Sequence, residues 1–72
     1  MSELPISIEL EQEVDGRWIA EVPLLPGVVV YGKTIVEAEA AVRALALRVL
    51  ADRVEHGEPV PDSVAELFAV QS

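Results

Sequence analysis

Residues 27–34 constrain the fold of this chain more than any other segment. Their sequence, Gly-Val-Val-Val-Tyr-Gly-Lys-Thr, matches the phosphate-loop pattern G-x-x-x-x-G-K-[ST]. A phosphate loop must bend so that successive N–H groups point at phosphate, and β-branched residues resist those conformations. Such loops also belong to much longer α/β domains, with an acidic residue at a second strand end to hold magnesium. We therefore interpret the segment as a strand, a tight turn and a helix cap, and expect no nucleotide binding and no cofactor.

A long helix is predicted to follow, over residues 35–56. Thr34 and Glu37 have the spacing of a capping box, and Gly57 is expected to end the helix. Plotted at about 100° per residue, the helix has two apolar stripes, one of which can cover a sheet. The first stripe is Ala38, Val42, Leu45 and Val49; the second is Ala40, Ala44, Leu47, Ala51 and Val54, with Leu50 at its margin.

The second stripe predicts self-association. A chain of 72 residues has a small core, yet 51% of its residues are hydrophobic. The usual supports for a domain of this size are disulfides, a metal or oligomerisation, and the chain has no Cys and one His. Of these three supports only oligomerisation remains, and we expect no metal site. We expect Leu47, Leu50 and Val54 to lie in a homo-oligomer interface.

Two strands are predicted before the helix. Residues 4–14 alternate between apolar and polar, and residues 17–22 resume a strand after the turn signal Asp15-Gly16. A three-residue loop of residues 14–16, with Gly16 left-handed as a bulge, leaves one face of the hairpin apolar. That register pairs Gln12 with Trp18, Leu10 with Ala20 and Ile8 with Val22, and it puts Trp18 in the core.

The opposite face of this hairpin is acidic. It carries Ser7, Glu9, Glu11, Glu13, Arg17, Ile19 and Glu21, and Glu9 faces Glu21. With a net charge of −8, such a surface repels nucleic acid and favours a basic partner. We expect a partner to bind at Glu9, Glu11, Glu21 and Ile19; the alternative is a merely solvated sheet face.

The remaining segments are less clear from the sequence. Residues 28–31 are rich in β-branched and aromatic side chains, which predicts a third strand buried on both faces. Residues 62–70 are compatible with a short helical turn capped by Asp62 and with an edge strand. No secretory signal and no apolar run long enough for a membrane span are evident, so a cytoplasmic location without membrane contact is the expectation.

The order of these features resembles the HicB-like antitoxin family. The shared pattern is an aromatic residue, A-E-V-P-x-L-P-G, a short strand, G-x-T, and E-A on the helix. It is carried here by Trp18, Ala20, Glu21, Val22, Pro23, Leu25, Pro26, Gly27, Gly32, Thr34, Glu37 and Ala38. The resemblance covers residues 4–61 and implies a partial RNase H-like fold without a catalytic centre, and a role as inhibitor of a small basic ribonuclease toxin.

Together these observations predict a single α+β domain over residues 1–72, with no separate DNA-binding domain. The fold class is a small antiparallel sheet of three to four strands with one long helix packed on one face. The expected function is non-catalytic binding of a basic toxin protein, without direct nucleic acid binding. Two alternatives stay open: a minimal or degenerate RNase H-like metal-dependent nuclease that uses the hairpin carboxylates, and an orphan self-associating scaffold.

Overall fold

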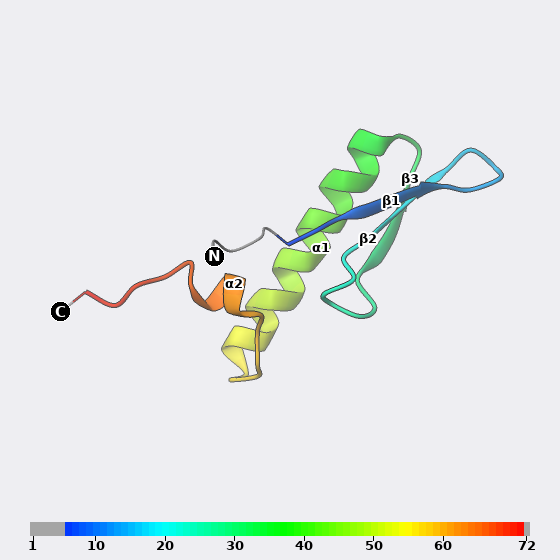
Figure 1. The fold of residues 1–72 in the computed structure, drawn as a ribbon. Coiled ribbons are helices and arrows are strands. Elements are labelled where there is room, and N and C mark those ends of the chain that lie inside the picture. Colours follow the sequence, from blue (N-terminus) through cyan, green and yellow to red (C-terminus); the bar gives the residue numbers. More distant parts are fainter. Residues whose placement is uncertain (1–5, 72) are drawn as a thin grey trace.

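A computed structural model describes residues 6–71 of the chain, so Leu4 and Pro5, at the start of the first predicted strand, lie outside the described residues. The element order is β1 (Glu9–Gln12), β2 (Trp18–Glu21), β3 (Val29–Gly32), α1 (Ile35–Glu55) and α2 (Asp62–Ala65). The strands form one antiparallel sheet in the order β1-β2-β3, and α1 crosses one of its faces (Figure 1). This arrangement confirms the small α+β fold.

The β1–β2 hairpin has the predicted bulged register. Gly16 adopts a φ of 92°, in the left-handed region where glycine is favoured. The Gly16 N–H donates to the Glu13 carbonyl at 2.9 Å, and the Glu13 N–H donates to the Arg17 carbonyl at 2.7 Å. Beyond this loop, Gln12 lies opposite Trp18 and Leu10 opposite Ala20, as expected from the apolar pattern.

The connection between β2 and β3 places one leucine in the core. The Leu25 N–H donates to the Val22 carbonyl at 2.9 Å, and the Val28 N–H donates to the Leu25 carbonyl at 3.0 Å. These bonds hold a compact turn from which Leu25 points inward and is fully buried. Gly27, at a φ of 90°, reverses the chain into β3.

β3 differs from its predicted environment. It is an edge strand, and Val29 and Tyr31 on its outer face are exposed, while Val30 packs against the core. The prediction of burial on both faces is therefore wrong. The reason is that α1 supplies the only covering layer in the described chain, and it lies on the inner face.

The joint between β3 and α1 is a tight turn followed by a cap. The Thr34 hydroxyl accepts a hydrogen bond from the Glu37 N–H at 3.1 Å. The Glu37 carboxylate accepts one from the Lys33 N–H at 2.9 Å, one residue before the position that a capping box uses. A Cβ added to Gly32 would lie 2.6 Å from the Ala38 backbone nitrogen, so strand and helix meet here at close range.

α1 ends where the sequence indicates. The Glu58 N–H donates to the Arg53 carbonyl at 2.8 Å, and the Gly57 N–H donates to the Val54 carbonyl at 3.2 Å, with Gly57 at a φ of 69°. This is the pair of bonds of a Schellman motif, which satisfies carbonyls that the end of a helix would leave unpaired.

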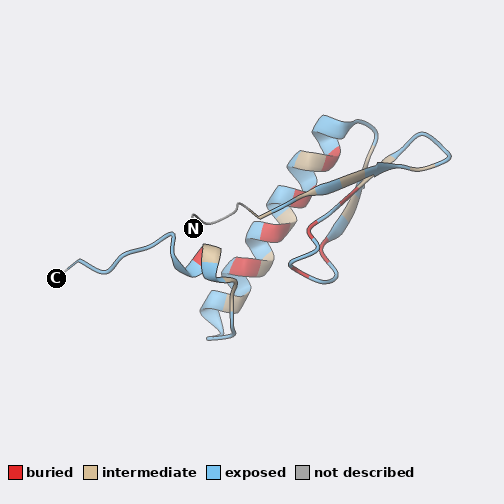
Figure 2. Cartoon of the chain, viewed as in Figure 1, coloured by how far each residue is buried: buried red, intermediate tan, exposed pale blue. Residues whose placement is uncertain are grey.

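The core lies between the sheet and one side of α1 (Figure 2). Of the two predicted stripes, the first faces the sheet as expected, with Ala38 and Val42 fully buried. Leu50 belongs to this buried side as well: it is 6% exposed, against 66% for Leu47. Leu50 is therefore mainly a core residue and not part of an exposed stripe, and its place in an interface between subunits stays a prediction. Leu50 shares the core cluster with Val64 of α2, so α2 widens the covered side of the helix.

The segment after α1 forms a short helix and no strand within the described residues. α2 begins directly after Pro61, and Asp62 is its first residue rather than a side-chain cap. Val64 is the buried residue of α2. Residues 66–71 continue without regular structure, so the sheet has three described strands and not four.

Within residues 6–71, none of the helices combines the length and the apolar character that crossing a membrane would require.

Candidate functional site: the outer face of the hairpin

The face of the sheet opposite α1 carries acidic and apolar side chains in register. Across the three strands, Glu9 lies opposite Glu21, which in turn lies opposite Val29. The next row is Glu11, Ile19 and Tyr31. Because strand side chains alternate between faces, these six residues share the outer face. The face is therefore acidic along β1 and apolar along β3.

A hollow of about 400 Å³ lies on the acidic side of this face. It is lined by Glu9, Leu10, Glu11, Ile19 and Glu21. All four residues that the sequence predicted for partner binding are among them. β1 and β2 bring these four together because the bulge at Gly16 fixes the register of the hairpin.

The carboxylates that line the hollow have no cationic partner within the described chain. Glu9, Glu11 and Glu21 are exposed, and none of them forms an ion pair with a described residue. Glu9 and Glu21 are paired across the strands, where like charges repel. A positive group from outside would relieve that repulsion.

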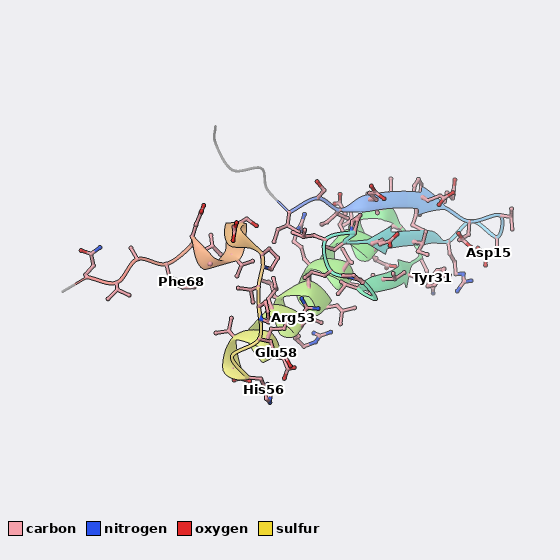
Figure 3. All side chains as sticks on the ribbon, turned by 60° about the horizontal axis from the view of Figure 1, so that its bottom comes forward. Asp15, Tyr31, Arg53, His56, Glu58 and Phe68 are labelled. Atoms are coloured by element: carbon pink, nitrogen blue, oxygen red, sulfur yellow. The ribbon has the colours of Figure 1, made fainter. Side chains whose placement is uncertain are left out.

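The nearest arginine along the hairpin is held elsewhere. Arg17 Nε lies 2.8 Å from Asp15 Oδ2, and the guanidinium stacks 4.6 Å from the centroid of the Tyr31 ring. The Arg17 backbone N–H donates to Asp15 Oδ1 at 3.0 Å. That hydrogen bond, followed by the contacts with the Arg17 side chain, lowers the pKa of Asp15 below its usual value. The positive charge is thus neutralised at the tip of the hairpin, where Figure 3 shows Asp15 beyond Tyr31.

The glutamates are spread along a face and do not converge on a point. Among residues 6–71, no group of three or more His, Cys, Asp or Glu side chains is placed to hold a metal ion. What this arrangement offers chemically is separate carboxylate acceptors beside an apolar strip. Such a surface suits guanidinium or ammonium groups, which carboxylates bind through charge-assisted hydrogen bonds.

Sequence reasoning missed the apolar half of this face. Val29 and Tyr31 extend the Ile19 position across β3, and both are exposed. The sequence carried no signal for this exposure, because residues 28–31 are an uninterrupted run of β-branched and aromatic side chains, which indicated burial on both sides. Tyr31 also holds Arg17 in place, which the sequence did not indicate.

The residues predicted for self-association lie on the other layer of the molecule. Leu47 and Val54 are exposed on α1, whereas Leu50 is buried beneath them in the core. The two predicted surfaces are therefore separate, one on the sheet and one on the helix.

Comparison with known proteins gave no match to any protein-family model, to any curated protein or to any solved structure.

Proposed function

We propose that this chain is a non-catalytic protein-binding domain whose outer hairpin face binds a basic protein. The observation that carries the proposal is the hollow lined by Glu9, Glu11, Glu21 and Ile19. Its carboxylates have no cationic partner among the described residues, so a basic partner gains ion pairs without displacing internal ones.

The shape of the face supports a protein partner over a small ligand. The hollow is open, and the exposed side chains of Val29 and Tyr31 lie beside it, opposite Glu21 and Ile19 in the sheet. A partner can place arginine or lysine side chains against the glutamates and an apolar side chain against the β3 strip. Mixed surfaces of this kind, with an exposed aromatic residue, are typical of protein interfaces.

The concrete form of the proposal is a HicB-like antitoxin of a toxin–antitoxin system, which neutralises a basic ribonuclease toxin. Its support is the resemblance of residues 18–38 to that family and the net charge of −8. A cytoplasmic location belongs to the same proposal. Direct binding of nucleic acid is not part of the proposal, because the acidic face repels phosphate. Nucleotide binding is not part of it either, because residues 29–32 form a strand. Successive N–H groups of a strand point in opposite directions and do not converge on a phosphate.

Self-association is the second part of the proposal. Leu47 and Val54 are 66% and 60% exposed on α1, in a chain whose composition is apolar for its size. A second subunit would remove this surface from water, which favours a homo-oligomer.

Capture of the partner, followed by an inhibition assay, tests the function. The wild-type chain serves as bait in a lysate of its native host, and the retained proteins are identified by mass spectrometry. We expect a small basic protein that cleaves RNA when purified alone and stops doing so as the chain is added. Capture of no basic protein would contradict the proposal.

Two charge-reversal variants make this assay specific to the hairpin. Glu9→Lys/Glu21→Lys alters the hollow, and Glu55→Lys/Glu58→Lys makes the same change in net charge at the end of α1. We expect the hairpin variant to bind the captured protein at least about tenfold more weakly, and the helix variant to stay within about threefold of wild type. Equal losses in both variants would show that only net charge matters.

Assays on the purified chain and its glutamate variants decide between the proposal and its alternatives. A metal-dependent nuclease would cleave nucleic acid by itself when magnesium or manganese is added, and Glu9→Gln or Glu21→Gln would abolish that cleavage. A self-associating scaffold would form oligomers and retain no other protein.

A further inference from the structure

An exposed apolar arm follows α2. We use this name for residues 67–70, Leu-Phe-Ala-Val, which follow α2. Leu67, Phe68 and Val70 are 72%, 80% and 97% exposed. The arm leads away from the sheet and from α1, and Phe68 lies far from the hairpin (Figures 1 and 3).

The molecule is elongated, with the arm at one end and the β1–β2 loop at the other (Figure 1). Its longest axis measures 52 Å and its radius of gyration is 14.2 Å, whereas a compact domain of this length has a radius of about 11 Å. Exposed apolar segments of this kind in small proteins mark contacts with another chain. The arm therefore needs an apolar surface on which to pack.

The molecule has one described groove with suitable chemistry. It has a volume of about 260 Å³ and opens between the segment before β1 and the middle of α1. Ile6, Ile8 and Val22 line it from the sheet side. Leu47, Leu50 and Arg43 line it from α1, so the groove is apolar with a single positive charge.

The charges of the two surfaces are complementary. Arg43 is the charged residue in the groove, and it forms no ion pair within residues 6–71. The arm follows directly on Glu66, and no lysine or arginine occurs after Arg53. An arm lying in the groove can bring Glu66 towards Arg43 while its apolar side chains cover Leu47 and Ile8.

The course of the chain favours the groove of another subunit over its own. To reach its own groove, the arm would have to reverse direction after α2. Residues 62–71 contain neither glycine nor proline, the residues that make tight reversals easy. The Leu67 N–H donates to the Val64 carbonyl at 3.1 Å and closes a turn, after which residues 68–71 lead away from the body without regular structure (Figure 1). Such a projecting segment suits exchange between two identical subunits.

We propose that two copies of this chain exchange their C-terminal arms, each arm occupying the groove of the other copy. In an extended arm Phe68 and Val70 point to the same side, and these two side chains enter the groove. The backbone of the arm runs beside residues 6–8, next to β1, which is an edge strand with unpaired backbone groups. This inference rests on the self-association proposed above and is independent of the basic partner.

Such an exchange can reach the buried area of a stable dimer. A specific interface buries about 1,200 Å² or more in total. A reciprocal exchange involves four surfaces, two arms and two grooves, so each has to contribute about 300 Å². One buried aromatic side chain supplies about 150–250 Å², and Val70, on the same side of the arm, adds to it.

Sedimentation equilibrium tests whether the arm holds the dimer together. We expect a wild-type dimer at micromolar concentration and a dissociation constant at least about tenfold higher for Phe68→Ser. The control is Val36→Ser, an equally simple change of an exposed valine on α1 outside the groove, which should dimerise as wild type does. A monomeric wild type would contradict self-association and arm exchange together. A dimer that Phe68→Ser leaves unchanged would contradict arm exchange alone.

Cross-linking tests where the arm binds. The chain has no cysteine, so single cysteines can be introduced without side reactions. Mixing Leu47→Cys chains with Phe68→Cys chains under mild oxidation should give a mixed disulfide dimer, whereas Val54→Cys, outside the groove, should not cross-link with Phe68→Cys. Self-cross-linking of Leu47→Cys without the mixed product would show that α1 packs on α1 and would overturn the proposal. So would a Leu47→Cys/Phe68→Cys chain that forms its disulfide internally.

Discussion

At the scale of single residues, two glycines decide the geometry on which the acidic face depends. Gly16 sets the hairpin register, because its positive φ makes room for the bulge that puts Glu9 opposite Glu21. Gly32 lets the sheet approach α1 closely, since any side chain there would meet the backbone of Ala38. The phosphate-loop match of residues 27–34 is thus accounted for by chain reversal, close packing and capping.

Replacing Gly32 by alanine should destabilise the fold. The added Cβ would lie 2.6 Å from the Ala38 nitrogen and 2.9 Å from its Cα, so the first turn of α1 must shift. We expect a loss of about 1–3 kcal/mol in the free energy of unfolding, as for other overpacked sites. Urea unfolding followed by the fluorescence of Trp18, the sole tryptophan, measures it.

The adjacent Lys33→Ala variant is the control for this measurement. Lys33 is exposed and its backbone N–H, which donates to Glu37, is retained in the variant. Its free energy of unfolding should stay within about 0.5 kcal/mol of wild type. Equal stability of the two variants would mean that β3 and α1 are not in close contact at Gly32.

At the scale of elements, the features that depend on local sequence pattern could be predicted. The hairpin register followed from matching apolar positions, and the bounds of α1 followed from Thr34 and Gly57. The environment of β3 and the position of Leu50 were wrong because both depend on which elements cover which face. The periodicity of α1 does not show which elements cover it, and in the structure Leu50 joins the core cluster that also includes Val64 of α2.

The connection between β2 and β3 gives a matched pair of leucines that tests the core. Leu25 is fully buried and its neighbour Leu24 is 52% exposed. Leu25→Ala should lower the free energy of unfolding by about 2–5 kcal/mol, because it removes buried methyl groups and leaves a cavity. For 72 residues the whole stability is about 4–11 kcal/mol, so this loss is a large share of it.

Leu24→Ala removes the same atoms as Leu25→Ala, but from a side chain that is half exposed. Its free energy of unfolding should stay within about 0.5 kcal/mol of wild type in the same urea titration. If Leu24→Ala proved as costly as Leu25→Ala, the turn would not place Leu25 in the core as described.

At the scale of the whole molecule, the two layers present different surfaces. The sheet shows carboxylates and an apolar strip to the outside, and α1 shows Leu47 and Val54. The four residues of the acidic surface could be predicted because a hairpin register follows from local sequence. The groove and the exposed arm could not, since they depend on where residues 6–8 and α2 settle against α1.

The most direct test of the account is to map the binding surface by nuclear magnetic resonance. The isotope-labelled chain is titrated with the basic protein that it retains from its host, and the backbone amide signals are followed. We predict that the largest shifts occur in β1 and β2, at Glu9, Glu11, Ile19 and Glu21, while the amides of Leu47 and Val54 on α1 stay in place. Shifts confined to α1 or to the arm, with β1 and β2 unchanged, would contradict the claim that the outer hairpin face is the binding site.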